Sequence, residues 1–235
     1  MSDFNYIGSE LDLFSEAQNW KAYYSSIIRR YLGSEVLEVG AGIGSTTQSL
    51  CQDNQKRWIC LEPDPNLSQR LKSSLMNNSL LNCCEIRVGT LIDLSPDEIF
   101  DTIIYIDVLE HIENDIQETK LAVNHLRKGG MLIVLAPAYQ WLFTPFDESI
   151  GHYRRYNRKS LFKTVPSTLE LICLKYLDSV GLFASISNRL VLRSKMPSRQ
   201  QILFWDKYMI PISRKIDPLV LHSFGKSILG IWRKL

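Results

Sequence analysis

The stretch Val36-Leu-Glu-Val-Gly-Ala-Gly-Ile-Gly-Ser-Thr-Thr47 decides the fold of this chain. Apolar and β-branched residues run into a segment with glycine at every second position. This pattern predicts a buried strand, a tight turn and the start of a helix. Glycines in such a turn let the backbone pass close to a ligand, because no Cβ stands in the way and positive φ is allowed. The stretch therefore predicts a ligand site at the end of a strand.

A second acidic position supports this interpretation. The apolar run Trp58-Ile-Cys-Leu61 ends in Glu62 and is followed by Pro63. An acidic residue at the tip of a second parallel strand can accept hydrogen bonds from both hydroxyls of a ribose. Together the two segments predict a site for an adenosine-containing cofactor, with Glu62 on the ribose and Pro63 beside it.

The glycine spacing argues against a dinucleotide. A pyrophosphate site needs a third glycine at the helix start, and the corresponding positions here are Ser45 and Thr47. Glu38 would also place a carboxylate close to the pyrophosphate, which is unfavourable for an anion. The same carboxylate suits a ligand that carries an ammonium and a sulfonium.

On these residues the segment resembles motif I of the class I S-adenosylmethionine-dependent methyltransferases, with Glu62 as their ribose-binding acid. The resemblance implies S-adenosylmethionine as the cofactor. It implies that Glu38 meets the cofactor's ammonium, directly or through water. The methionine end is then expected against Gly40, Ala41, Gly42 and Gly44.

Strands and helices are expected to alternate along most of the chain. The expected strands are 35–40, 57–62, 84–89, 101–106 and 131–136; the expected helices are 14–32, one from about 45, 64–76 and 112–127, the last stopped by Lys128-Gly129-Gly130. Such alternation predicts a parallel sheet with right-handed crossovers and a ligand at the carboxyl ends of the strands.

Beyond residue 137 the pattern of expected elements changes. A loop at 137–156, a helix at 158–166 and a strand at 169–179 are expected, followed by helical stretches broken by Pro197, Pro211 and Pro218. This order resembles the class I methyltransferase fold, an α/β, Rossmann-like, mostly parallel seven-stranded sheet with helices on both faces and an antiparallel final strand. A single domain over 1–235 is expected, with a helical extension at 1–33, a cofactor-binding core at 34–180, a basic helical insertion at 181–225 and a last strand at 226–235.

Two further strand ends carry candidate cofactor residues. The run Asp101-Thr-Ile-Ile-Tyr-Ile106 is followed by Asp107 and Val108, which would face the cofactor cleft. In the fold that the chain resembles, the residues just past the third strand cover the adenine ring, which implies Thr90 and Leu91. Glu110 is interpreted as an acid in a first helical turn.

The loop at 137–156 is rich in aromatic and charged residues, as functional lids and binding loops often are. Arg154 and Arg155 offer fork-shaped donors for a phosphate or carboxylate. The alternative is a structural cluster that pins the loop, for example Asp147 with Arg154. The loop contains the pattern Phe146-Asp-x-x-x-Gly-His-x-Arg-Arg-Tyr156. This pattern resembles one in a methyltransferase group associated with bacterial polysaccharide or glycolipid gene products.

The predicted activity is methyl transfer to a small-molecule or lipid- or sugar-linked acceptor, most readily at a hydroxyl. A hydroxyl needs a base, and the candidates are His152 and then His111. Amine or carboxylate acceptors, an NAD(P)-dependent oxidoreductase and a non-catalytic cofactor-binding subunit remain alternatives. The residues expected to contact the acceptor or to close over it are Trp20, Tyr23, Tyr139, Tyr153, Arg154 and Arg155.

Composition sets further expectations. The five cysteines show no C-x-x-C spacing and the four histidines no metal-binding spacing, so reduced thiols, a cytoplasmic protein and no metal site are predicted. No apolar run reaches membrane-spanning length. Residues 186–235 hold ten Lys or Arg against two Asp, which predicts either a solvated face or peripheral contact with an anionic membrane. A nucleic-acid partner is not expected, because the Pro-Pro-Tyr/Phe tetrapeptide of amino-directed nucleic-acid methyltransferases is absent at the end of the fourth expected strand. No oligomeric state is predicted.

Overall fold

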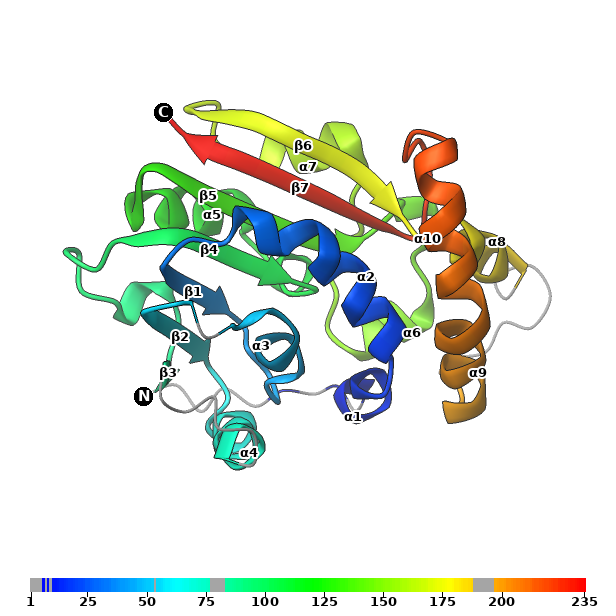
Figure 1. Ribbon diagram of the computed structural model, residues 1–235, viewed down its shortest axis with the longest axis horizontal. Helices are drawn as coiled ribbons and strands as arrows, with labels where there is room; N and C mark the ends of the chain where they lie inside the picture. The colour runs from blue at the N-terminus through cyan, green and yellow to red at the C-terminus, as the bar shows by residue number, and fades with distance from the viewer. Residues whose placement is uncertain (1–5, 7, 9, 53, 77–82, 188–196) are drawn as a thin grey trace.

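A seven-stranded sheet forms the centre of the computed structural model, which describes residues 6, 8, 10–52, 54–76, 83–187 and 197–235 (Figure 1). The strand order is β3-β2-β1-β4-β5-β7-β6. The strands are β1 (Glu35–Val39), β2 (Arg57–Glu62), β3 (Cys84–Val88), β4 (Phe100–Ile106), β5 (Leu126–Pro137), β6 (Leu169–Leu177) and β7 (Ser227–Lys234). The predicted fold class is confirmed.

The direction of each strand follows from its neighbours. β1 pairs in parallel with β2 and β4, and β3 and β5 extend the parallel part on either side. β7 is antiparallel to both β5 and β6, as expected for the last strand. β1 and β2 are buried along nearly their whole length, which explains their continuous apolar sequence.

Helices cover both faces of the sheet. In Figure 1, α2 (Gln18–Ile28) and α3 (Ser45–Leu50) lie in front of the sheet, whereas α5 (Asp115–Asn124) and α7 (Arg158–Thr164) lie behind it. α4 (Pro65–Met76) lies beside β2 and β3. The buried side chains form two core clusters accordingly, one on each face.

Two helix predictions were too long. The predicted helix 14–32 is divided into α1 (Glu10–Ser15), α2 and the 3₁₀ turn η1 (Arg29–Tyr31). Of the predicted helix 112–127 only α5 forms, and the 3₁₀ turn η4 (Leu109–His111) precedes it. Lys128-Gly129-Gly130 does not stop this helix, because it lies inside β5, which already pairs with β4 at Leu126. The pairing of β5 with β4 therefore decides the structure of Gly129 and Gly130, although glycines at this position predicted the end of a helix.

A helical cap stands beyond the carboxyl ends of the parallel strands (Figure 1). It consists of α8 (Ser179–Ser187), α9 (Arg199–Phe204), the π-helical turn η7 (Trp205–Met209) and α10 (Ile210–Leu219). The last three follow one another without a break, so Pro211 and Pro218 do not interrupt the helix as predicted. Pro211 comes directly after the π-helical turn, as the second residue of α10, and Pro218 lies near the end of α10.

Buried carboxylates fasten the cap to the sheet and to α2. Asp178 accepts hydrogen bonds from Trp205 Nε1 at 2.7 Å and from Ser213 Oγ at 2.7 Å. Asp217 accepts one from the Tyr23 hydroxyl at 2.8 Å. Asp206 Oδ1 accepts one from the Trp20 backbone at 2.8 Å. Each of the three carboxylates is thus satisfied by donors from other elements, so the cap is held in a defined position.

Among the residues that the structure describes, no helix is both long enough and apolar enough to span a membrane.

Candidate active site

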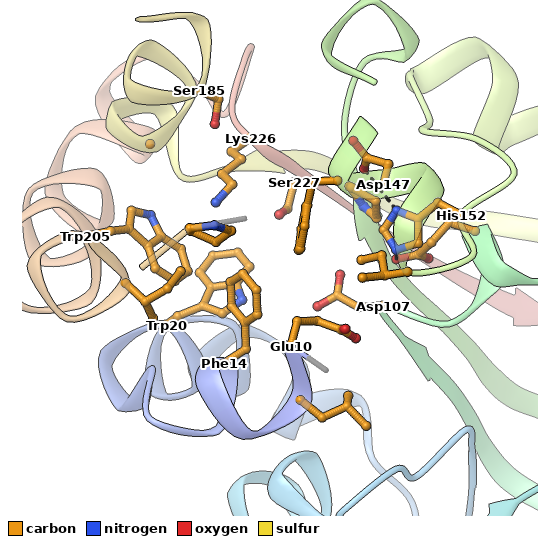
Figure 2. Close-up of a pocket in the computed structure, with 18 of the residues that line it drawn as sticks. Glu10, Phe14, Trp20, Asp107, Asp147, His152, Ser185, Trp205, Lys226 and Ser227 are labelled. Atoms are coloured by element: carbon orange, nitrogen blue, oxygen red, sulfur yellow. Dashed lines mark hydrogen bonds and ion pairs between the residues drawn. The ribbon is translucent and has the colours of Figure 1, made fainter. Parts of the chain in front are cut away.

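A cavity of about 1070 Å³ opens at the carboxyl edge of the sheet. Its walls come from the N-terminal helices, the glycine turn, the end of β4, the loop after β5 and the cap. Figure 2 shows Trp205 and Lys226 on one side of it and Asp107, Asp147 and His152 on the other, with Glu10 and Phe14 projecting from the N-terminal segment. The position is the one predicted for a ligand of a parallel sheet.

The glycine turn forms the floor of the cavity as the sequence predicts. Gly40, Gly42 and Gly44 have φ values of 68°, 56° and 84°. A Cβ on Gly40 would lie 2.6 Å from Val108, and one on Gly44 would lie 2.4 Å from Leu71. These two glycines are needed for close packing, so Gly44 and Val108 support the turn from behind rather than line the cavity. Gly40, Ala41 and Gly42 do line it.

Glu62 fixes the turn, but it is buried and lies outside the cavity wall, so its contact with a ribose stays a prediction. Its two oxygens accept backbone hydrogen bonds from Gly42 at 2.8 Å and from Asp64 at 3.0 Å. Burial raises the pKa of this carboxyl, and the two backbone donors oppose that rise. Each oxygen keeps a second acceptor position, as a ribose diol requires. Pro63 lies between Glu62 and Asp64, outside the cavity wall.

Glu38 lies behind the turn and not in the cavity wall. Its Oε2 accepts hydrogen bonds from Thr47 Oγ1 at 2.7 Å and Trp58 Nε1 at 2.8 Å. Burial raises the pKa of Glu38 to about 7 in spite of these two donors. This oxygen therefore braces the turn, and contact with a cofactor ammonium stays a prediction.

The residues expected to cover the adenine, Thr90 and Leu91, do not line the cavity. Thr90 is exposed and caps the 3₁₀ turn η3 (Leu91–Asp93), because its backbone N–H donates to Asp93 Oδ2 at 2.8 Å. The Leu91 side chain is buried in the core. Contact of Leu91 with adenine stays a prediction, and the burial of the side chain leaves the backbone as the part of Leu91 that could make it.

The N-terminal segment covers the cavity to an extent that the sequence did not indicate. The backbone N–H of Tyr6 donates to Asp64 Oδ2 at 2.7 Å, and its hydroxyl donates to Glu10. Glu10 Oε2 is buried without a hydrogen-bond partner, and Leu11 lies 3.8 Å from the position of a Cβ on Gly42. Of the two aromatic residues predicted here, Trp20 lines the cavity, whereas Tyr23 is engaged with Asp217 in the core.

These observations fit an adenosyl cofactor. Gly42 leaves its side of the turn open, Glu62 is fixed with free acceptor positions, and Asp107 lines the cavity at the end of β4. Asp107 has a φ of 54°, and burial raises its pKa to about 6, against the effect of nearby His152 and Lys226.

Glu110, His111 and His152 meet in the cavity wall. The two imidazole rings are in edge-to-face contact with centroids 4.4 Å apart, and His152 Nε2 lies 3.8 Å from Glu110 Oε1. Neither oxygen of Glu110 has a hydrogen-bond partner, although the residue is 0% exposed. Burial and the neighbouring His152 lower the pKa of His111 to about 3, so this ring is neutral at pH 7.

Asp147 orients His152. Its Oδ1 lies 3.0 Å from His152 Nδ1, and it also forms an ion pair with Arg155, whose Nε lies 2.8 Å away. Burial alone would raise the pKa of Asp147, but hydrogen bonds from His152, Arg155 and Thr144 bring it well below its usual range. An ionised carboxylate at this position favours the tautomer of His152 with the proton on Nδ1, in which Nε2 carries the lone pair.

Several residues predicted to bind the acceptor do not reach the cavity. Arg154 donates to the carbonyls of Ile112 and Glu113 and forms an ion pair with Asp115. Tyr153 is exposed with Arg154 beside its ring, and Tyr139 stacks on Tyr176. The predicted structural cluster exists, but Asp147 pairs with Arg155 and not with Arg154. Only Arg155 of this group lines the cavity.

The cap adds residues that sequence reasoning missed. Lys226 Nζ lies 4.4 Å from the centre of the Trp205 ring, and both residues line the cavity. Burial lowers the pKa of Lys226, against the effect of Asp178. No local motif marks these positions, because they come from the π-helical turn and the start of β7.

Two groups of potential metal ligands occur among the described residues. The first is Glu110, His111 and His152, and the second is Cys51, Cys83 and Cys84; in each group the ligand atoms lie within 4.8 Å of one another. The spacing of histidines and cysteines along the chain gave no sign of either, since each group joins separate segments.

Comparisons with known proteins agree with this geometry. Residues 37–132 match a family described as a methyltransferase domain. A mitochondrial ubiquinone biosynthesis O-methyltransferase of Dictyostelium discoideum is 25% identical over 112 residues, which cover 43% of this chain. The match spans 35% of the length of that relative.

Solved structures share the whole fold. An S-adenosylmethionine-dependent methyltransferase from Clostridium acetobutylicum ATCC 824 aligns with a TM-score of 0.59 and 13% identity over 93% of this chain and 92% of that one. A chain of the complex between the Trm112 methyltransferase activator and a methyltransferase of Haloferax volcanii aligns with a TM-score of 0.66 and 13% identity, over 96% and 94%. At these identities the likeness shows the fold.

Proposed function

We propose that this chain, whose residues 37–132 match a methyltransferase domain, is a class I S-adenosylmethionine-dependent methyltransferase that methylates a small-molecule or lipid- or sugar-linked acceptor at a hydroxyl oxygen. The observation that carries this proposal is the group of His111, His152 and Asp107 next to the glycine turn in one cavity. When bound, the cofactor supplies a methyl carbon already activated by a sulfonium. The protein then has to align the acceptor oxygen with the methyl carbon and to remove the proton of the acceptor hydroxyl.

His152 is the proposed base. A hydroxyl oxygen that accepts a methyl group must lose its proton, and Nε2 of His152 has a lone pair because Asp147 holds the other ring nitrogen. The imidazolium that forms would be stabilised by the ionised Asp147. His111, neutral and in contact with His152, is the second candidate.

The cofactor would lie across the glycine turn. Gly40, Ala41 and Gly42 are proposed to contact its methionine end, with Glu38 acting on the ammonium through water. Glu62, flanked by Pro63, is proposed to bind the ribose, and the backbone at Thr90 and Leu91 to border the adenine. Asp107 and Val108 belong to the methyl-donor region.

An acceptor hydroxyl is favoured over a carboxylate by the cations of the site. Arg155 is already paired with Asp147, and Arg154 is outside the cavity. Among the described residues no carboxylate lies within ion-pair distance of Lys226, so a carboxylate acceptor would depend on this side chain. An amine acceptor, or a binding subunit without activity, would make the base unnecessary.

Thermal unfolding with added ligands tests the cofactor. S-adenosylmethionine or S-adenosylhomocysteine at 100 times its dissociation constant should stabilise the fold by about 2.7 kcal/mol, an upward shift of roughly 5–10 °C. Homocysteine formation with an acceptor extract then tests the activity. A shift with NADH alone would overturn the proposal in favour of an oxidoreductase.

Peripheral membrane contact through the cap is a second proposal, since the cap exposes Phe204, Tyr208 and Ile212. Much of the predicted basic charge has other partners, because Arg199 pairs with Glu16 and Arg233 with Glu170. Co-sedimentation with anionic vesicles at low and high salt tests it. Absence of the protein from the pellet at low salt would reject it.

A further inference from the structure

Glu110 is a buried carboxylate without a partner at the wall of the cavity. It is 0% exposed, and neither of its oxygens accepts a hydrogen bond within the described structure. Buried charges are normally paired, hydrogen-bonded or bound to a metal. An orphaned carboxylate in a cavity wall therefore points to a ligand.

The neighbours of Glu110 are metal-binding groups. His111 follows it in the same 3₁₀ turn, and His152 comes from the loop after α6 (Pro145–Ser149). One ligand atom from each lies within 4.8 Å of the others. Ligand atoms around a first-row ion are about 3–4 Å apart, so small side-chain rotations would close the set.

The surroundings prepare His152 for this role. Its Nδ1 is 3.0 Å from Asp147 Oδ1, which leaves Nε2 facing Glu110 Oε1 at 3.8 Å. A carboxylate behind the second ring nitrogen is the usual arrangement around a metal-bound histidine. Asp147 is itself fixed by Arg155 and Thr144. Asp107 in the same cavity adds a further negative charge that favours a cation.

We propose that Glu110, His111 and His152 form a binding site for a divalent first-row metal ion at the wall of the cavity. Two imidazoles and one carboxylate leave open positions for water or a substrate oxygen. Its role in catalysis rests on the proposed function: the ion would bind the acceptor hydroxyl and lower its pKa. His152 is then a ligand, and the proton leaves to solvent or to another base.

Titration with Mn²⁺ tests the site. Binding is measured as the loss of the electron paramagnetic resonance signal of the free ion. Mn²⁺ is chosen because it prefers oxygen and nitrogen to the thiolates of the cysteine group. The wild-type chain, without cofactor or acceptor, should bind one ion. Glu110→Gln and His152→Ala should each weaken binding at least ~10-fold.

Matched controls separate the site from other effects. Glu118→Gln makes the same change outside the cavity, where Glu118 accepts a hydrogen bond from the Tyr105 hydroxyl, and should bind Mn²⁺ normally. Cys51→Ser should also bind normally. Glu110→Gln keeps the size and shape of the side chain and breaks no hydrogen bond of the described structure, so it should keep its melting temperature and loss of binding would not reflect unfolding.

Two results would overturn the metal site: no saturable Mn²⁺ binding by the wild type, or wild-type affinity in Glu110→Gln. Neither result depends on methyl transfer. Transfer that persists in a chelator, together with absent Mn²⁺ binding, would remove the ion and leave His152 as base. Mn²⁺ binding without any transfer would keep the site and reject the proposed function.

Discussion

Glu38, behind the glycine turn, and Glu110, in the wall of the candidate active site, are both buried carboxylates. Glu38, on the cofactor side, accepts hydrogen bonds from Thr47 and Trp58. Glu110, on the side of the proposed acceptor, has no hydrogen-bond partner at either oxygen among the residues that the structure describes. Burial raises the pKa of both groups.

The difference separates a structural carboxylate from one that awaits a ligand. The partners of Glu38 come from α3 and β2, elements that pack against β1 in any case, so the cofactor half is complete without a ligand. Glu110 lies beside His111 and His152 in the cavity wall. The free-energy cost of burying the Glu110 carboxyl without a hydrogen bond is offset only when a ligand binds to it.

The two halves also differ in how they are held. A single continuous stretch builds the glycine turn, and Glu62 closes it through Gly42. The acceptor half instead depends on the loop after β5, where Asp147 joins His152 and Arg155. Substitutions in the two halves should therefore have different consequences.

The largest effect is expected from Asp147→Asn. The change leaves Arg155 as an uncompensated, largely buried charge and should lower the free energy of unfolding by about 3–5 kcal/mol. Urea unfolding measures it. Glu170→Gln, which breaks the exposed pair with Arg233, should cost about 0–1 kcal/mol. Equal costs would mean that the acceptor half is not held by Asp147.

His152→Ala should reduce turnover by ~10²-fold or more while leaving cofactor affinity unchanged. The reason is that His152 contacts the acceptor half only. Steady-state kinetics and a cofactor titration measure the two quantities. His125→Ala is the control, because His125 bonds to the Glu98 carbonyl away from the cavity. Normal turnover in His152→Ala would shift the role to His111 or to no base.

Glu62→Ala should weaken S-adenosylmethionine binding by about 1–3 kcal/mol if it holds both ribose hydroxyls. Mn²⁺ affinity should stay the same, because Glu62 belongs to the other half of the site. Calorimetric titration of each ligand measures both. Unchanged cofactor affinity would remove the ribose assignment.

Glu38→Gln should change the pH dependence of stability. The pKa of Glu38 is raised from 4.5 to about 7, so the folded state holds a proton that the unfolded chain releases. Its stabilising contribution is therefore present at low pH and is lost as pH rises through about 7. The wild type should lose about 2–3 kcal/mol relative to the glutamine variant between about pH 5 and pH 8. Parallel stability curves would contradict a buried, titrating Glu38.

The site shows which kinds of residue local reasoning can find. Gly40, Gly42 and Glu62 were predictable because a turn and a strand end have local signatures. Arg154 and Tyr153 were misassigned because their residue types suit a ligand, whereas tertiary contacts direct them to Asp115 and to solvent. Helix ends failed where strand pairing intervened, as at Gly129-Gly130 in β5.

The sequence by itself determined the order of strands and helices, the parallel core, the glycine turn and the class of cofactor. Periodicity and turn chemistry are local properties, and a parallel sheet brings its strand ends together without further information. Only the tertiary structure decided which carboxylates are satisfied and which are not. Glu110, His111 and His152 meet, and Lys226 reaches Trp205, because separate segments fold onto one edge of the sheet. Burial and partner geometry then set the charge of each group, and neither can be derived from spacing along the chain.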